Sequence, residues 1–335
     1  MTKSKANVNQ RSPAQFVMGI MTGMLVPMMV SEIYGVKAMR KQPELTETPG
    51  MPHAAELWMA FAYAVGMIAL RYVTSKAFYP LSRAILPPVV RDSAFRVDRL
   101  ATSLFKVLFF TWITIYGYQT IKDEEWFPVS LGGSGDIVKS FQVFNIAPSQ
   151  ELKTYLQLQL AYQMHSLLYV LLMKPIDGDT MDFVIHDFTA ILLMTSSYLV
   201  NYTAISALIG FLNDACDIFQ YTFFVSTDSE RKPVIAVMFV AVLAIWGYTR
   251  LYVYPFEMLP NVFVELPGNN PNVSPLYLRP VEVMLCLLLG LQTWWFFLFA
   301  DKGRQKLLKR SGYVQIGQAT PVKLQDEVVI KTATL

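Results

Sequence analysis

Residues 181–201 read MDFVIHDFTAILLMTSSYLVN, and this stretch decides both the fold class and the place where function is expected. It has the length and apolar content of a membrane-crossing helix, which needs about 20 residues, yet it carries His186 and Asp187 near its start. An ionisable side chain inside such a helix costs about 2.5–3.5 kcal/mol on insertion, so it is a functional candidate. Successive residues of a helix point about 100° apart, so we expect His186 and Asp187 to face different neighbours and not to form a dyad.

Two further apolar stretches contain polar residues in the same way. Residues 211–221 read FLNDACDIFQY, in which Asp214 and Asp217 are three residues apart and are expected to share a helix face. A later stretch ends WGYTRLYVYPF (residues 246–256) and carries Arg250. Together these stretches predict a hydrated cavity between the helices that contain them.

The rest of the chain extends this pattern to a membrane protein. Hydrophobic residues make up 53% of the 335 residues and charged residues only 16%, whereas soluble domains contain about 25% charged residues. The stretches of near-membrane length are 14–33, 55–73, 104–120, 155–173, 183–200, 205–225, 233–254 and 281–300. The sequence therefore predicts an all-α, polytopic membrane helix bundle of about eight transmembrane helices.

Charge and cysteine content exclude two other classes of protein. The net charge of +3 is too small for a nucleic-acid-binding protein. Cys216 and Cys286 both lie inside apolar runs, which argues against a disulfide framework.

The distribution of basic residues predicts the orientation of the chain. Lys and Arg are concentrated before the first span, in the loop after the second span and in the C-terminal tail. The positive-inside rule places both termini on the cytosolic side, or on the matrix side of a mitochondrial inner membrane.

We divide the chain into four segments. They are a basic tail with two spans and a basic linker (1–95), a helical domain (96–262), a loop with the last span (263–300) and a basic polar tail (301–335). A long connection rich in Gly and Pro, residues 123–150, is either a surface for a partner or an ordinary connector.

The polar residues of the spans also carry a resemblance. His186–Asp187, then Ser197–Tyr198 with Asn201, then Asn213–Asp214 with Asp217 follow the spacing of the longevity-assurance motif over about 40 residues. In this respect the chain resembles the TLC-domain membrane proteins, and most closely the ceramide synthases, over residues 96–262. The resemblance implies an acyl-CoA-dependent N-acyltransferase that acts on a long-chain base, with acyl-CoA as co-substrate and no cofactor.

The chain departs from that motif at positions that are normally ionisable. Asp187 stands where the family has a second histidine, and Asn213 stands where it has the histidine of its HD pair. Tyr221 and Phe224 replace a Glu and a Lys, and Ala204 replaces an Arg. These changes remove bases and cations while leaving Asp187, Asp214 and Asp217 together, so the carboxylates must pair, be hydrated, bind a cation or protonate.

We therefore expect a protein that has kept the fold and lost acyl transfer, and that serves as a lipid-binding or structural subunit of a membrane complex. The residues expected to line its lipid cavity are Asp187, Asn213, Tyr198, Tyr221 and Arg250. The alternative is an active sphingoid-base N-acyltransferase in which His186 is the base and Asp214 and Asp217 orient it or the substrate amine. A metal site formed by His186 and the three aspartates is chemically plausible, but its spacing is not diagnostic and no metal is expected.

Location and partners follow from the same reasoning. The expected partners are membrane lipids, including an acyl chain or a sphingolipid, and subunits of a larger membrane complex, but not nucleic acid. The resemblance implies the endoplasmic reticulum. Because residues 1–31 contain no Asp or Glu, the mitochondrial inner membrane is the alternative.

Overall fold

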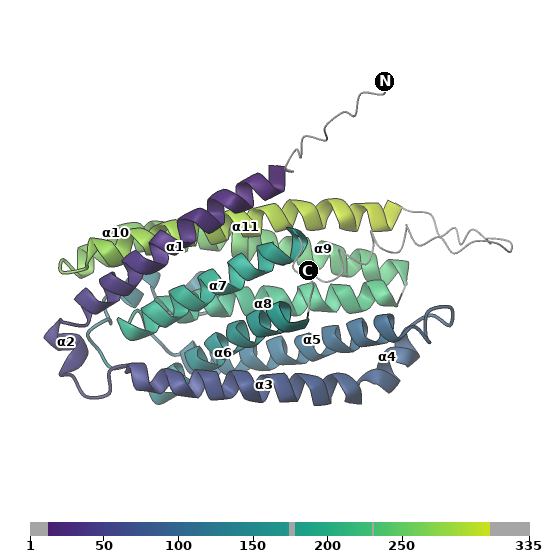
Figure 1. The fold of residues 1–335 in the computed structure, drawn as a ribbon, viewed down its shortest axis with the longest axis horizontal. Coiled ribbons are helices and arrows are strands. Elements are labelled where there is room, and N and C mark those ends of the chain that lie inside the picture. The colour runs from purple at the N-terminus through teal and green to yellow at the C-terminus, as the bar shows by residue number, and fades with distance from the viewer. Residues whose placement is uncertain (1–12, 174–177, 230, 309–335) are drawn as a thin grey trace, which may run out of the picture.

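The computed structural model describes residues 13–173, 178–229 and 231–308, which form an elongated bundle of helices (Figure 1). The long helices are α1 (Pro13–Met39), α3 (Leu57–Ala77), α5 (Ala94–Ile121), α6 (Gln150–Met173), α7 (Gly178–Leu199), α8 (Thr203–Asp228), α9 (Lys232–Tyr248) and α11 (Pro275–Leu308). The π-helical segment η4 (Thr249–Met258) and α10 (Leu259–Asn269) continue α9 without a break. The short elements are α2 (Pro43–Thr46), α4 (Tyr79–Ile85) and the 3-10 turns η1 (Ala54–Glu56), η2 (Val129–Leu131) and η3 (Ile137–Phe141).

This architecture confirms the all-α membrane bundle. Within the described residues, four helical segments are long and apolar enough to cross a membrane: Ala54–Ala77, Ala94–Ile121, Lys232–Asn269 and Pro275–Gln305. The other long helices, α1, α6, α7 and α8, coincide with the remaining stretches predicted from the sequence. The first described residues of α1 and the last of α11 point toward the same end of the bundle (Figure 1).

The helix formed by α9, η4 and α10 is longer than the seventh predicted span, 233–254. We expected it to stop near residue 254 and a loop to begin at residue 263, but the helix continues to Asn269. Pro255 lies inside η4, and proline cannot donate the backbone hydrogen bond of a regular α-helix. The helix absorbs this lost bond by widening into a π-turn instead of ending.

The two ends of the bundle differ, and we name them by their short helices. The α2 end holds α2 and the connection from α10 to α11, and the α4 end holds α4 and the connection from α8 to α9 (Figure 1). At the α2 end, residues 122–149 fold back over the helices, and Trp126, Phe127 and Phe141 are buried in the core. The long connection is thus an ordered cap on this end of the bundle.

Helix α8 lies in the interior, where aromatic contacts fix it against its neighbours. It packs most extensively on α5, where the rings of Tyr221 and Phe110 are stacked with centroids 5.5 Å apart. Phe109 of α5 in turn stacks on Tyr162 of α6 at 4.5 Å. This packing places the polar residues of α8 inside the bundle.

Helix α1 packs across α7 and α11, and Gly35 permits its closest approach. A Cβ atom at Gly35 would lie 2.3 Å from the backbone nitrogen of Tyr277 in α11. The atoms that such a Cβ would meet belong to the backbone of α11, which cannot move aside as a flexible side chain can. The two helices can therefore approach this closely only because residue 35 has no side chain.

We expect Gly35→Ala to lower the free energy of unfolding by about 1–3 kcal/mol, as overpacking does. The thermal unfolding midpoint of the purified protein in detergent measures this loss. Gly23→Ala in the same helix is the control, because a Cβ atom at Gly23 meets nothing within 4 Å. Equal midpoints for the two variants would show that α1 does not depend on close contact with α11.

Candidate functional site

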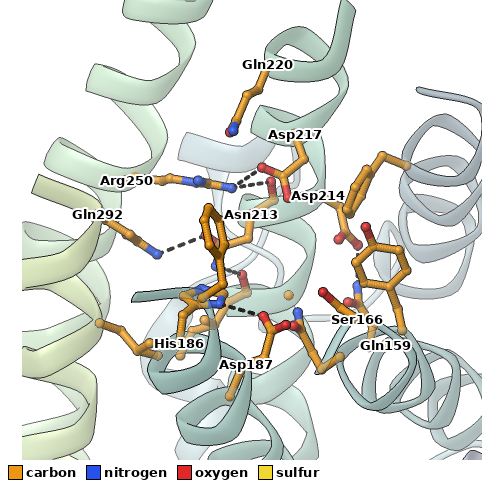
Figure 2. Close-up of a pocket in the computed structure, with 18 of the residues that line it drawn as sticks. Gln159, Ser166, His186, Asp187, Asn213, Asp214, Asp217, Gln220, Arg250 and Gln292 are labelled. Carbon is orange, nitrogen blue, oxygen red and sulfur yellow. Dashed lines mark hydrogen bonds and ion pairs between the residues drawn. The ribbon is translucent and has the colours of Figure 1, made fainter. Parts of the chain in front are cut away.

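A cavity of about 640 Å³ lies inside the bundle, among α3, α5, α6, α7, α8, α11 and the α9–α10 helix. Its lining runs from Phe95 and Lys302 near the α4 end to Tyr202 and Tyr277 at the α2 end. The lining toward the α2 end is mainly apolar and includes Ile205, Val262, Leu266, Val281 and Leu285. The charged side chains that the sequence singled out occupy the middle, together with His186 and Asn213 (Figure 2).

His186 and Asp187 of α7 contact each other directly, which corrects our expectation that they would not form a pair. The distance between His186 Nδ1 and Asp187 Oδ1 is 3.1 Å, because both side chains bend toward the same side of the helix (Figure 2). The imidazole also lies against Trp295 of α11, with ring centroids 5.2 Å apart. The second carboxylate oxygen of Asp187 is buried and has no partner among the described residues.

Arg250 connects η4 to the polar face of α8. Its guanidinium forms an ion pair with Asp217, donates to the backbone carbonyl of Asn213 at 3.1 Å and lies 4.8 Å from the ring centroid of Trp246. The carboxylate and the cation thereby neutralise each other inside the bundle.

Both ends of the Asn213 carboxamide are hydrogen-bonded. Its Nδ2 donates to the carbonyl of Ile209 at 2.7 Å, and its Oδ1 accepts from Gln292 Nε2 at 3.1 Å. An amide does not exchange protons as an imidazole does, so this position cannot serve as a base.

Asp214 and Asp217 are three residues apart on α8 but have separate partners. Whereas Asp217 contacts Arg250, Asp214 accepts a hydrogen bond from Gln159 of α6, and Tyr155 Oη lies 3.5 Å from Asp214 Oδ2. Figure 2 shows the two carboxylates directed at different helices. They do not form a joint carboxylate pair.

Tyr221 also lines the cavity, toward the α4 end from Asp217. Its hydroxyl accepts from Lys106 Nζ at 2.9 Å. Lys106 of α5 therefore contacts the phenol of Tyr221, at the position where the ceramide synthase motif described above has a glutamate.

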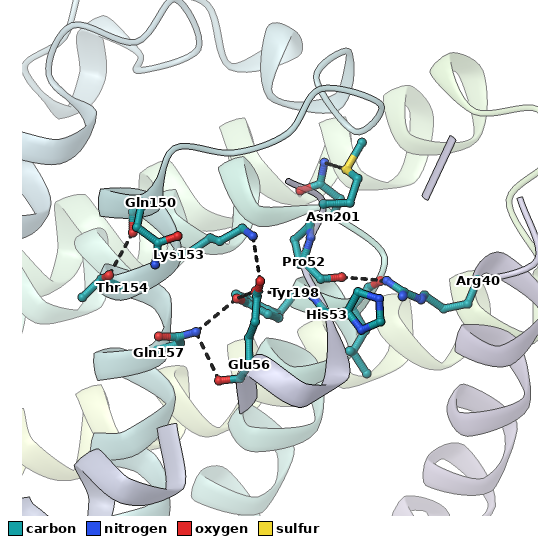
Figure 3. Close-up of polar contacts among 12 residues, drawn as sticks. Arg40, Pro52, His53, Glu56, Gln150, Lys153, Thr154, Gln157, Tyr198 and Asn201 are labelled. Carbon is teal, nitrogen blue, oxygen red and sulfur yellow. Dashed lines mark hydrogen bonds and ion pairs between the residues drawn. The ribbon is translucent and has the colours of Figure 1, made fainter. Parts of the chain in front are cut away.

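Tyr198 is the predicted site residue that does not line the cavity. It belongs to a separate cluster at the α2 end (Figure 3), where its hydroxyl donates to Glu56 at 2.5 Å and accepts from Gln157 at 3.1 Å. Lys153 pairs with the same Glu56 carboxylate at 3.0 Å. This cluster joins the starts of α3 and α6 to the end of α7, and Ser197 lines the cavity instead.

Several cavity residues escaped the sequence analysis. Gln159 lies in the predicted stretch 155–173, but its contact with Asp214 was not predicted. Gln292 lies in the predicted span 281–300 directly after the apolar run 285–291, so the sequence did not indicate that it belongs to a polar site. Among the described residues, no group of three His, Cys, Asp or Glu side chains is arranged to hold a metal ion.

Comparison with known proteins agrees with this arrangement. The TLC-domain family matches residues 99–301, from α5 to α11. Ceramide synthase LOH2 of Arabidopsis thaliana is 26% identical over 284 residues, which cover 79% of this chain and 92% of that protein. Ceramide synthase hyl-2 of Caenorhabditis elegans is 23% identical over 76% of this chain and 80% of its own length, and human ceramide synthase 4 is 29% identical over 42% of this chain and 37% of its own. Because the family match covers more than half of the 335 residues, the chain belongs to the TLC-domain family and is a membrane protein similar to ceramide synthases.

Proposed function

We propose that this protein binds one acyl chain of a membrane lipid in its cavity and does not transfer acyl groups. The observation that carries the proposal is the loss of two of the three histidines of the family motif from the polar centre of the cavity. Among the described residues, His186 is the one histidine lining the cavity, and the positions where the family has its other two histidines hold Asp187 and Asn213. One of these is a carboxylate and the other an amide with both ends hydrogen-bonded.

The shape of the cavity supports a lipid ligand. Its volume of about 640 Å³ lies within the roughly 300–1,000 Å³ that small-ligand pockets occupy. The apolar lining toward the α2 end suits an acyl chain, and the polar centre suits the first atoms of a head group.

A second candidate function is sphingoid-base N-acylation, and one contact favours it. Nδ1 of His186 faces Asp187 at 3.1 Å, which would leave Nε2 to act as a base oriented by a carboxylate. The amine nitrogen of the base would attack the thioester carbonyl of acyl-CoA, and His186 would take the proton that the nitrogen loses. The coenzyme A thiolate would leave and take up a proton.

The wider setting is part of the proposal. The protein would serve as a subunit of a membrane complex in the endoplasmic reticulum, with the mitochondrial inner membrane as the alternative and both termini on the cytosolic or matrix side. Helices α1 and α3 lie outside the family match, so they are the elements by which such a subunit could differ from its relatives.

We expect the purified protein to produce no ceramide above the level of His186→Ala when it is offered long-chain bases and acyl-CoAs. The physical reason is that His186 is the only histidine among the described residues of the centre and Asn213 cannot relay a proton. Ceramide synthase LOH2 in the same detergent is the positive control. Turnover by the wild type that disappears in His186→Ala would establish the enzyme instead, and Asp187→His/Asn213→His tests whether the scaffold can regain activity.

We expect lipid bound to the purified protein to be lost when the apolar end of the cavity is filled. Ile209→Trp adds bulk to the cavity wall, and an overpacking cost of about 1–3 kcal/mol corresponds to about tenfold less lipid retained. Native mass spectrometry measures the bound fraction. Ile115→Trp is the matched control, since Ile115 is 53% exposed on the outer face of α5. Equal lipid content in the two variants would mean that the lipid binds elsewhere.

A further inference from the structure

Arg71 is a buried cation in the cavity wall, and acyl-chain binding alone does not explain why it is there. It lies within the membrane-length part of α3, about 9 Å from the end of that helix at Ala77 (six residues at 1.5 Å each). Its side chain is only 8% exposed and lines the cavity. Because α3 precedes the family match at residues 99–301, the motif of the family does not account for this arginine.

The arginine has no carboxylate to neutralise it within the part of the chain that the structure describes. The two other arginines buried in this region each have one, since Arg99 pairs with Asp228 and Arg250 with Asp217. None of the ion pairs among the described residues includes Arg71. A buried arginine inside a membrane protein normally pairs with an anion or marks a substrate pathway.

The contact that Arg71 does make leaves its hydrogen-bonding capacity open. Its guanidinium carbon lies 3.4 Å from the ring centroid of Tyr169 in α6. Stacking on a ring face orients the guanidinium plane, but the five N–H groups lie at the edge of that plane and need acceptors. The stacking on Tyr169 therefore orients the N–H groups of Arg71 but provides no hydrogen-bond acceptor for them.

Further donors line the same cavity. Lys106 of α5 lines it, with its ammonium group 4.4 Å from the ring of Tyr221, and Ser166 of α6 adds a hydroxyl (Figure 2). Arg71, Lys106 and Ser166 thus supply two cations and a hydroxyl to the cavity lining, one side chain each from α3, α5 and α6. An ammonium head group would be repelled by the two cations, whereas carboxylate and phosphate oxygens match the fork geometry of arginine.

We propose that Arg71, assisted by Lys106 and Ser166, is an anion subsite for the head group of a single-chain lipid, namely a carboxylate or a phosphate monoester. The inference rests on the proposed lipid binding and assigns the chemical class of the head group. A lipid fits better than a free ion because the site lies inside the membrane-length part of α3 and belongs to a cavity whose lining toward the α2 end is mainly apolar.

The test compares four probes on the full chain in detergent, at a pH well above the carboxyl pKa. They are oleate, 1-oleoyl-lysophosphatidate, the neutral analogue oleyl alcohol, and inorganic phosphate. Dissociation constants are measured for the wild type, for Arg71→Met and for Arg71→Lys. The methionine keeps an apolar stem against Tyr169, and an apolar residue in place of a buried charge is commonly tolerated. Arg83→Met is the matched control, because Arg83 is exposed on α4.

We expect the wild type to bind at least one of the two anionic lipids about tenfold or more tightly than the alcohol, the size of effect that a charged hydrogen bond gives. Arg71→Met should abolish this preference without changing the affinity for the alcohol. Arg71→Lys should retain part of it, and Arg83→Met should retain it in full.

Each contrary result has a distinct meaning. Oleyl alcohol binding as tightly as both anions, or Arg71→Met keeping the full preference, would overturn the anion subsite while leaving lipid binding intact. Inorganic phosphate binding as tightly as the lysophosphatidate would overturn the assignment to a lipid. Absence of binding by all three lipids would overturn the proposed function itself.

Discussion

The bonds of Arg250 to α8 are the interaction on which the polar centre depends. Inside a membrane, a carboxylate has no water to stabilise it unless the protein provides a cavity or a counter-charge. Arg250 supplies that charge to Asp217 and at the same time holds the carbonyl of Asn213. Because it reaches α8 from η4, the ion pair also fixes how the long α9–α10 helix lies against the core. Trp246 of the same helix lies against the guanidinium, so its position beside the centre follows from that placement.

Charge is distributed unevenly around the cavity, and this distribution determines which kind of ligand the cavity favours. Asp217 is neutralised by Arg250, whereas Asp187 meets an imidazole and Asp214 meets an amide and a phenol. On another wall, Arg71 meets a ring face instead of a carboxylate. Opposite charges therefore lie along one cavity without cancelling, which favours a ligand with a polar head over a purely apolar chain.

The sequence predicted the helices well because length and hydrophobicity are local properties. The long helices fall where the apolar stretches lie, and the polar residues of α7, α8 and η4 line one cavity as expected. The contacts of individual side chains could not be predicted in the same way. Which neighbour Asp214 meets depends on how α6 and α8 are rotated about their own axes, and the pairing of His186 with Asp187 depends on rotamers. Tyr198 shows the same limit, since one residue along α7 separates the cavity wall from the cluster around Glu56.

The π-helical segment has a consequence for how the chain can vary in length. A π-turn contains about one residue more than an α-turn, and one residue changes the direction of every following side chain by about 100°. Val262 and Leu266 of α10 follow this π-helical segment and line the cavity, so their direction relative to Arg250 depends on the number of residues in the segment. Removal of a single residue from Thr249–Met258 would turn those side chains away while leaving α9 in place. The number of residues in η4 therefore determines how the cavity-lining side chains of α10 are rotated relative to Arg250. An insertion or deletion in this segment would disturb the cavity as much as a substitution of its residues.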